Sequence, residues 1–368
     1  MRSASRRGFI AQAASAAVAP FLSTRVTRAL AQGSRRKIGF AICGLGRLSE
    51  LRIAPAFAKT QHCRLAGLIT DTPEKSREWQ ARYGIPARSV YTYETMERMA
   101  DDRDIDVVYI VTPNALHAEQ TSRAARAGKH VFCEKPMEVS VEKCRQMIDA
   151  CKAANRLLGI AYRCRYDPNH LECIRIARAL EFGPIRTIDA GFGNRLTTGR
   201  AGKWRLERQL SGGGALVDMG IYALQATRYL TGEEPVEVSA FETKPDPARF
   251  VEVDEQMSWL ARFPGGVVAN CAASYDTSGL NFFKVHAERG WFGLEPAFSS
   301  VGTHGERSDG KVIALAVPDP FAAEMDDFAR CILEGRPSNV SGEEGLKDVR
   351  IATAIYESAR TRRVVKLA

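Results

Sequence analysis

The sequence lacks the usual signs of a metal site, a disulfide framework or a nucleic-acid-binding surface. Its nine cysteines are odd in number and include no CxxC pair, and its six histidines show no metal-ligand spacing. Aromatic residues make up only 8% of the chain, and no basic stretch is interleaved with them. We therefore expect no metal ion, no nucleic-acid partner, and reduced cysteines that pack as small apolar side chains.

The sequence also lacks a strong charge of one sign and a long apolar run. The net charge of +9 falls to +4 when residues 1–31, which hold five arginines and no acidic residue, are set aside. The apolar run at residues 11–22 is too short to cross a bilayer, which needs about 20 residues. We expect no stable membrane association. With 45% apolar and 26% charged residues, the 368-residue chain is typical of a soluble globular protein with two domains.

Residues 1–31 are typical of a twin-arginine signal peptide. The pattern SRRGFI at residues 5–10 precedes the weakly apolar run, and a small-x-small cleavage site follows at residues 29–31. The alternative is a disordered basic tail. The signal predicts that the folded protein is exported to the periplasm, with the twin-arginine translocase as a partner during export.

The most informative stretch is KIGFAICGLGRLS, residues 37–49. Its apolar first half predicts a buried parallel strand, and a GxGxxS pattern follows at once. Gly44 permits a tight turn into a helix, and Gly46 lets the backbone approach a pyrophosphate at that helix N-terminus. Ser49 stands where Gly or Ala is usual, so we expect the helix slightly further from its strand. An ordinary strand–turn–helix is the alternative.

Strands and helices alternate through residues 32–158. We expect strands at 37–43, 63–70, 90–91, 106–111, 130–133 and 157–161, with helices at 51–59, 74–83, 93–100, 115–127 and 140–155 between them. This alternation predicts an α/β fold with a doubly wound parallel sheet, a Rossmann domain that binds a dinucleotide.

The end of the second strand decides between the two nicotinamide cofactors. Asp71 would favour the ribose hydroxyls of NAD, whereas Thr70 and Lys75, with Arg47 across the turn, would hold the 2′-phosphate of NADP. We favour NADP(H) and expect Asp71 to point away. Such a cofactor is scarce outside the cytoplasm, so an exported enzyme must load it before export and retain it.

Two other strand ends carry polar residues where open α/β sheets bind ligands. Asn114 is a candidate N-cap, and His117 in the same turn is either a structural residue or a cofactor contact. Glu134 and Lys135 follow the fifth strand directly. Pro136 keeps Lys135 out of the helical region, which directs its side chain toward the crevice and permits a cis bond.

Residues 159–368 form the second predicted domain, which binds substrate and supports oligomerisation. A strand expected at 185–192 begins a new sheet. Short links join the later strands expected at 236–241, 256–263, 267–275, 281–287 and 291–294, which predicts antiparallel hairpins and a large open, mostly antiparallel sheet. Helices are expected at 168–182, 321–334 and 342–359. An exposed sheet face of this kind favours a homo-oligomer, a dimer or tetramer.

A second glycine cluster, at residues 212–214, opens a helix that carries Asp218 and Tyr222 on one face. An acid and a phenol are thus aimed the same way from the first turns of that helix. Upstream, Trp204 and Arg205 are suited to stack on, or hydrogen-bond to, a ring and its carboxamide. The alternative for Trp204 is packing in an interface.

These motifs together resemble the glucose–fructose oxidoreductase branch of the Gfo/Idh/MocA oxidoreductase family, from about residue 37 to 365. The resemblance rests on GxGxxS, TPNALHAE, AGKHVFCEKP, GIAYRCRYDP, KWRL and SGGGALVDMGIYALQATRYLTGEEP. It implies that Lys135, Asp218 and Tyr222 are catalytic, with Arg163 nearby. It also implies a tightly bound NADP(H). The family enzyme holds its cofactor with a long Pro-rich arm, and only residues 32–36 stand in its place here.

The full set of expected contacts follows from the strand ends and the resemblance. Around the cofactor we expect Gly44, Leu45, Gly46, Arg47, Leu48, Thr70, Lys75, Thr112, Pro113, Asn114, His117, Glu134, Lys135, Arg163, Trp204 and Arg205. Around a sugar we expect Lys135, Arg163, Tyr166, Asp218, Tyr222 and Tyr275, with the loops at 194–202 and 275–279 shaping the pocket.

The predicted reaction is a ping-pong hydride transfer between sugars. Tyr222 takes the proton of the C1 hydroxyl of an aldose as hydride passes to NADP⁺, and it later returns a proton to a second sugar, a ketose or an aldose. A free phenol has a pKa of about 10, so we expect Lys135 to help it act as a base. The alternatives are a sugar or dihydrodiol dehydrogenase with an exchangeable cofactor, and a non-catalytic periplasmic sugar-binding protein.

Overall fold

The structure is a computed structural model that describes residues 36–197 and 200–367. The predicted signal peptide at residues 1–31 lies outside the described residues. Within the described residues, no helix is both long and apolar enough to cross a membrane.

The first sheet has six parallel strands in the order β3-β2-β1-β4-β5-β6. This is the strand order of a dinucleotide-binding Rossmann sheet. The strands are β1 (Ile38–Cys43), β2 (Cys63–Ile69), β3 (Val90–Tyr91), β4 (Val107–Ile110), β5 (His130–Glu134) and β6 (Leu158–Ala161). They form because short apolar runs, buried on both faces, alternate with helices. The predicted α/β fold class is confirmed.

The helices of this part are α2 (Pro73–Tyr83), α3 (His117–Arg126) and α4 (Val141–Ala153). The segment after the glycine turn is helical despite Pro55, because it changes form along its length. A π-helical turn at Ser49–Ile53 passes into α1 (Ala54–Ala56) and a 3₁₀ turn at Phe57–Lys59. Pro55 follows the π-helical turn directly, and this turn changes the backbone hydrogen-bond spacing at the point where Pro55 has no N–H to donate.

The second sheet has nine strands in the order β14-β13-β12-β11-β7-β10-β9-β8-β15. They are β7 (Ile185–Gly193), β8 (Glu237–Thr243), β9 (Gln256–Arg262), β10 (Val268–Ser274), β11 (Asn281–Ala287), β12 (Gly290–Leu294), β13 (Gly305–Arg307), β14 (Val312–Ile313) and β15 (Val365–Lys366). The expected hairpins β8–β9, β9–β10 and β11–β12 are confirmed. The hairpin expected between the strands at 267–275 and 281–287, which are β10 and β11, is wrong. β7 lies between β10 and β11, parallel to β10 and antiparallel to β11.

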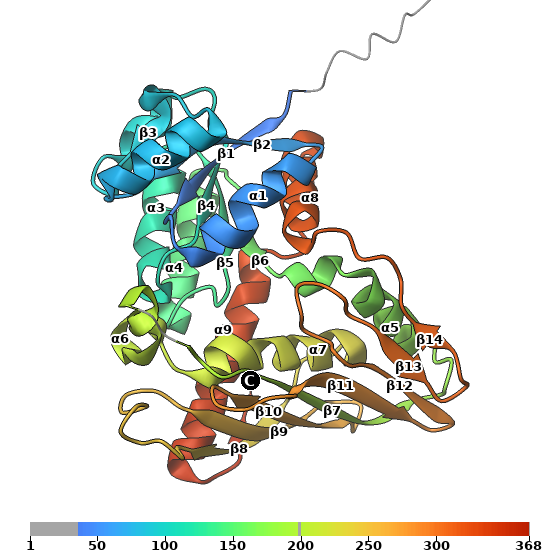
Figure 1. The fold of residues 1–368 in the computed structure, drawn as a ribbon. Helices are drawn as coiled ribbons and strands as arrows, with labels where there is room; N and C mark the ends of the chain where they lie inside the picture. Colours follow the sequence, from blue (N-terminus) through green and yellow to red (C-terminus); the bar gives the residue numbers. More distant parts are fainter. Residues whose placement is uncertain (1–35, 198–199, 368) are drawn as a thin grey trace, which may run out of the picture. The chain divides into compact units, whose positions relative to one another are not determined.

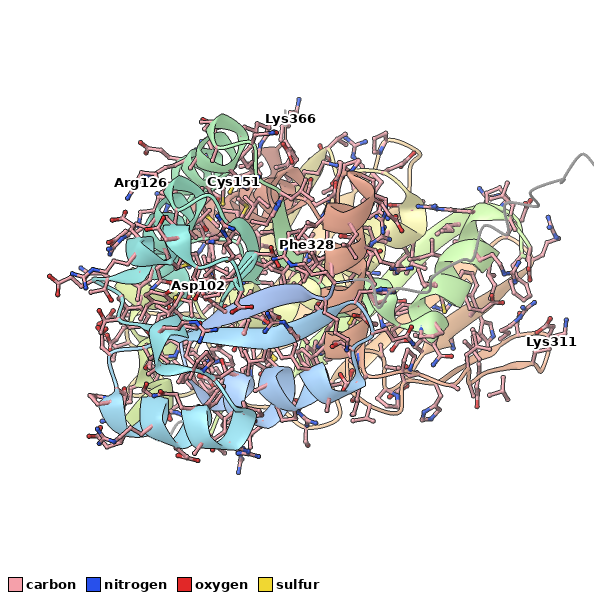
Figure 2. All side chains as sticks on the ribbon, turned by 90° about the horizontal axis from the view of Figure 1, so that it is seen from above. Asp102, Arg126, Cys151, Lys311, Phe328 and Lys366 are labelled. Atoms are coloured by element: carbon pink, nitrogen blue, oxygen red, sulfur yellow. The ribbon has the colours of Figure 1, made fainter. Side chains whose placement is uncertain are left out.

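Helices cover one face of this sheet and connect it to the first one. Helix α7 (Ile221–Thr231) packs on β7 and β10, and α5 (Pro168–Arg178) packs on α7 (Figure 1). The C-terminal helices α8 (Pro320–Glu334) and α9 (Gly342–Thr361) return to the Rossmann sheet. Phe328, labelled in Figure 2, stacks on Phe132 of β5 at 4.9 Å between ring centroids.

Each sheet has its own apolar core, and the two cores meet at one side chain. The partly buried ring of Tyr222 packs against both of them. The residue that the sequence marks as catalytic is therefore fixed at the junction between the dinucleotide-binding sheet and the open sheet.

Candidate active site

The glycine turn after β1 has the geometry that a pyrophosphate requires. Gly44 has a φ of +100°, and a Cβ atom there would lie 2.8 Å from the Val111 carbonyl oxygen. A Cβ atom on Gly46 would meet no atom within 4 Å, so the backbone faces open space. The hydroxyl of the buried Ser49 donates a hydrogen bond of 2.6 Å to the Gly44 carbonyl oxygen. Ser49 is therefore a structural part of the turn.

A cavity of about 460 Å³ begins at this turn and fits a dinucleotide. Fourteen of the sixteen residues expected around the cofactor line it. They are Gly44, Leu45, Gly46, Arg47, Leu48, Thr70, Lys75, Thr112, Pro113, Asn114, Glu134, Lys135, Trp204 and Arg205. Sequence reasoning missed Thr72, Tyr93, Val111, Thr197 and Gly202. Thr72 and Val111 sit directly beside predicted contacts and could have been found from them.

Thr70, Lys75 and Arg47, the residues expected to hold a 2′-phosphate, all line this cavity. The Lys75 ammonium donates to the Leu45 carbonyl oxygen at 2.8 Å. Asp71 is not among the lining residues, and its carboxylate accepts a hydrogen bond of 2.9 Å from the backbone N–H of Tyr93, which does line the cavity.

Two predicted residues of the β4 loop have structural roles instead. His117 is fully buried, with its ring nitrogens 2.9 Å from the Thr112 carbonyl oxygen and 3.1 Å from that of Met137. Of its two interpretations, the structural one fits. The Asn114 amide donates to the Ser211 carbonyl oxygen at 2.7 Å, and no side chain caps α3. The expectation that Asn114 is an N-cap is therefore wrong.

The carboxylate of Asp218 is the electrostatic centre of the site. It accepts hydrogen bonds from the Lys135 ammonium at 3.0 Å, the Arg205 guanidinium at 3.2 Å and the Tyr275 hydroxyl at 3.1 Å. The Lys135 ammonium also donates to the Asp218 carbonyl oxygen at 2.7 Å. Burial raises the pKa of Asp218, but the charges of Lys135 and Arg205 outweigh that effect and hold it well below its usual range.

The hydroxyl of Tyr222 is held by Arg163, whose guanidinium Nε donates to it at 3.2 Å. The Lys135 ammonium instead lies 4.9 Å from the centroid of the Tyr222 ring. Because a guanidinium can only donate, the phenol oxygen accepts this bond and its own proton is free to be given elsewhere. The cation that donates to the hydroxyl is therefore Arg163, and the Lys135 ammonium, which was expected to help the phenol act as a base, lies over the same ring.

Arg163 is itself fixed in position. It follows β6 in the 3₁₀ turn Arg163–Tyr166, and its guanidinium donates to the carbonyl oxygens of Phe298 at 2.6 Å and Ser299 at 3.2 Å. Its carbon Cζ lies 4.7 Å from the centroid of the Tyr222 ring. Edge-on packing of Phe192 at 5.4 Å holds the other side of that ring.

A second, larger cavity of about 770 Å³ joins the dinucleotide cavity at Lys135, Arg205 and Asp218. Lys135, Arg163, Asp218 and Tyr222 line it, as expected for a sugar site. Residues that sequence reasoning did not single out add amide and hydroxyl groups, namely Asn194, Asn281, Ser299 and Ser300. Asn194 and Thr197 belong to the loop that was expected to shape the pocket.

Two predicted sugar contacts do not line either cavity. The Tyr166 hydroxyl donates to the Asp327 carboxylate of α8 at 3.0 Å. Tyr275 is buried, and its hydroxyl donates to the Asp218 carboxylate from outside the two cavities. Both lie close to the site in sequence and space, but their side chains point into the protein. Tyr275 is therefore a positioning residue for Asp218.

The low pKa of Asp218 makes a prediction about stability. Since its folded-state pKa lies below the unfolded value of about 4, the stabilisation is present above that pH and is lost as the pH falls through the folded value. Asp218→Asn leaves two cations without a charged partner, and we expect it to lower the free energy of unfolding by about 3 kcal/mol at pH 7. Urea denaturation between pH 7 and 3 measures this.

The matched control for that prediction is Asp276→Asn, because the Asp276 pair with Arg195 is solvent-exposed. We expect this variant to lose less than about 1 kcal/mol. Equal losses in the two variants at every pH would contradict the assignment of Asp218 as the electrostatic centre.

Models of one protein family match both halves of the chain. A model described as an oxidoreductase family with an NAD-binding Rossmann fold (GFO_IDH_MocA) matches residues 38–162. A model of the GFO/IDH/MocA C-terminal domain matches residues 170–293. The structure of an aldose-aldose oxidoreductase from Caulobacter crescentus, complexed with glycerol, is 44% identical with a TM-score of 0.86, over 90% of this chain and 100% of that one.

Two curated relatives carry a named sugar activity. D-xylose 1-dehydrogenase (NADP(+)) of Haloarcula marismortui is 31% identical over 354 residues, which cover 90% of this chain and 93% of the relative. D-xylose 1-dehydrogenase (NADP(+)) 2 of Haloferax volcanii is 30% identical over 334 residues, which cover 89% of this chain and 99% of the relative.

Proposed function

The chain belongs to the GFO/IDH/MocA oxidoreductase family and is a sugar oxidoreductase, and we propose that it transfers hydride between two sugars. In this proposal it oxidises an aldose to an aldonolactone and reduces a second sugar to an alditol without releasing its cofactor. The observation that carries the proposal is that one cleft has a dinucleotide half and a sugar half that meet at Asp218. The 44% identity to an aldose-aldose oxidoreductase supports it.

The proposed cofactor is NADP(H), tightly bound. The glycine turn would hold the pyrophosphate, and Thr70, Lys75 and Arg47 would hold the 2′-phosphate. A nicotinamide cofactor held there would supply the hydride acceptor for C1 of one sugar and, in its reduced form, the hydride donor for a second. Trp204 and Arg205, whose side chains stack at 4.5 Å, border the junction of the two halves and would cover the nicotinamide end.

The residues around the sugar transfer a proton and stabilise the negative charge that this transfer leaves on the phenol oxygen. As the phenolate, Tyr222 takes the proton of the C1 hydroxyl in the oxidative half, and as the phenol it gives that proton to the second sugar in the reductive half, which regenerates the phenolate. Arg163 stabilises the phenolate that forms, because its N–H already points at the phenol oxygen. Asp218 holds Lys135 in place, and the Lys135 ammonium is free to donate a further hydrogen bond to a sugar oxygen.

We also propose that the protein acts in the periplasm after export through the twin-arginine pathway, on the basis of the pattern at residues 5–10. Since the cofactor must then be retained, we assign its retention to the segment Arg200–Leu206, which carries Trp204 and Arg205 over the dinucleotide cavity. This segment takes the place of the Pro-rich arm that residues 32–36 are too few to supply.

We propose that the open sheet forms a homo-oligomer. Phe241 of β8 is 69% exposed and Leu260 of β9 is 47% exposed. Both border a hollow of about 370 Å³ on that sheet, which Phe282 and Asn270 also line. Phe241→Asp is expected to lower the mass measured by analytical ultracentrifugation, and an unchanged mass would exclude this face as the interface.

A second candidate function is an NADP-dependent sugar dehydrogenase that exchanges its cofactor at each turnover. The curated relatives named D-xylose 1-dehydrogenase favour it. The two functions differ in what the purified protein does without added cofactor. In the retained-cofactor case, one aldose alone produces the near-ultraviolet absorbance of reduced nicotinamide in the protein fraction. A protein that shows no change until NADP⁺ is supplied is an ordinary dehydrogenase.

The NADP assignment makes a separate prediction. We expect Lys75→Ala to raise the Kd for NADP⁺ by about tenfold and the Kd for NAD⁺ by much less, because only the former carries a 2′-phosphate. Tryptophan fluorescence quenching by each nucleotide measures both constants in protein from which bound nucleotide has been removed. The matched control is Lys37→Ala, since Lys37 bonds the Thr60 carbonyl oxygen outside the cavity. Equal weakening of both nucleotides by Lys75→Ala would refute the phosphate role.

A further inference from the structure

Two buried carboxyl groups meet at one phenol beside the cleft. Tyr109 of β4 places its hydroxyl oxygen 2.8 Å from Glu134 Oε1, at the end of β5, and 3.3 Å from Glu324 Oε1, on α8. Tyr109 and Glu324 are fully buried and Glu134 is 8% exposed. Glu324 Oε2 is also buried and has no hydrogen-bond partner among the described residues. Apolar rings surround the group, with Phe132 4.9 Å from the Tyr109 ring and Phe328 stacked on Phe132.

The number of protons decides how these groups can bond. A phenol has one proton, and ionised carboxylates have none, so one phenol cannot satisfy two carboxylates. Two negative charges that both lie within hydrogen-bonding distance of one phenol, in an apolar interior, are also strongly unfavourable. An arrangement with every bond made needs one additional proton. The longer distance belongs to Glu324, which leaves the shorter, stronger bond for Glu134.

We propose that Glu324 is protonated and donates to the Tyr109 oxygen, while Tyr109 donates to the carboxylate of Glu134. The two carboxyls then form a pair that carries one negative charge and one shared proton. Burial raises the pKa of Glu324 well above its usual range, and the charge of Glu134 raises it further. Burial also raises the pKa of Glu134, against the opposing charge of Lys135. These directions agree with the geometry.

The pair matters for function because Glu134 lines both halves of the cleft and precedes Lys135. Glu324 and Tyr109 do not line either half of the cleft, so they are positioning residues that act through Glu134. The other titratable or charged groups whose fields reach the two carboxyls are Lys135, Arg163, Cys133, Cys164 and Tyr166. Lys135 and Arg163 favour the negative charge on the pair. Burial raises the pKa of Cys133 and of Tyr166. Burial also raises the pKa of Cys164, but the charges of Arg163 and His170 outweigh that effect and lower it.

The effect of the carboxyl pair on cofactor affinity rests on the proposed function, whereas the protonation of Glu324 does not. If the pair lost its shared proton at alkaline pH, a second negative charge would appear beside the nicotinamide end of the cavity. That charge favours the cationic ring of NADP⁺ over the neutral ring of NADPH. The ratio of the Kd for NADPH to the Kd for NADP⁺ is therefore expected to rise by about tenfold as the pair titrates.

Glu324→Gln removes the proton that can be lost but keeps the size and the hydrogen-bond donor of the protonated side chain. The amide of Gln can donate to the Tyr109 oxygen as the protonated acid does, but it cannot lose that proton. We expect this variant to keep the fold and its affinity ratio, with no dependence on pH above neutrality. Glu324→Leu, which cannot donate, is expected to lose the orientation of Glu134, and Tyr356→Phe is the control because it removes a buried phenol–carboxylate bond to Asp254.

Infrared difference spectroscopy tests the proton directly, with no cofactor or substrate. We expect the wild-type protein at pH 7 to show the C=O stretching band of a protonated carboxyl that is missing in Glu324→Gln and retained in Tyr356→Phe. The band of Tyr109→Phe should shift, because its hydrogen-bond partner is gone. Identical carboxyl bands in the wild type and Glu324→Gln would overturn the proposal, whatever the enzyme's reaction. If the band of the protonated carboxyl is present but the ratio of the two Kd values does not change with pH, the proton is confirmed and only the effect of the pair on the cofactor is overturned.

Discussion

Tyr222→Phe is expected to lower kcat by about 10³-fold while the Kd for NADP⁺ stays within about twofold of the wild type. The variant removes only the hydroxyl oxygen that exchanges a proton with the sugar, and general acid–base catalysis of this kind contributes about 10²- to 10⁴-fold. The ring keeps its packing against Phe192 and its contact with Arg163. Steady-state kinetics and nucleotide fluorescence measure the two quantities.

The same helix supplies the control. Tyr229 lies seven residues on in α7, and its hydroxyl is buried without a hydrogen-bond partner among the described residues. We expect Tyr229→Phe to retain the wild-type kcat. A Tyr222→Phe enzyme that turns over normally would remove Tyr222 from the reaction, and a parallel loss in Tyr229→Phe would mean that the helix, not the hydroxyl, had been disturbed.

Arg163→Gln is expected to lower kcat by about 10²-fold. The guanidinium is the only cation that donates to the Tyr222 hydroxyl among the described residues, and loss of one positioned donor to a developing negative charge costs about 10²- to 10³-fold. Steady-state kinetics with a single aldose measure this loss.

Lys135→Ala and Arg165→Gln separate the roles of the neighbouring cations. The Lys135 ammonium bonds Asp218 and contacts only the ring of Tyr222, so we expect Lys135→Ala to lower kcat less than Arg163→Gln does. Arg165 lies in the same turn as Arg163 and stacks at 4.2 Å on Tyr229, outside the cleft. Its substitution is expected to leave kcat unchanged. A larger loss of kcat in Lys135→Ala than in Arg163→Gln would assign the role at the hydroxyl to Lys135.

The dinucleotide half of the site could be predicted from the sequence almost completely. Backbone groups and strand ends form it, and these follow from local patterns such as the two glycines at residues 44 and 46. Asp71 was ambiguous in sequence, because its hydrogen bond to the Tyr93 backbone joins residues 22 positions apart. The interior position of His117 could not be deduced, because the partners of its ring nitrogens come from different loops.

The sugar half could be predicted only in part. Asp218 and Tyr222 are close in sequence on one helix, so their shared direction was evident. Arg163 and Tyr222 are 59 residues apart, and no local pattern places a guanidinium on that hydroxyl. The directions of Tyr166 and Tyr275 depend on α8 and on Asp218, which the sequence does not position. The expected hairpin between β10 and β11 failed for the same reason. β7, which is far away in the sequence, pairs with both of these strands.

The central claim is that one bound cofactor carries hydride from one sugar to another past Tyr222. The most direct measurement is to incubate the purified protein, without added nucleotide, with a single aldose that carries deuterium at C1. We expect equal amounts of aldonolactone and alditol, with two deuterium atoms at C1 of the alditol, one from its own precursor and one transferred. No alditol, or an alditol with only its original deuterium, would contradict the account.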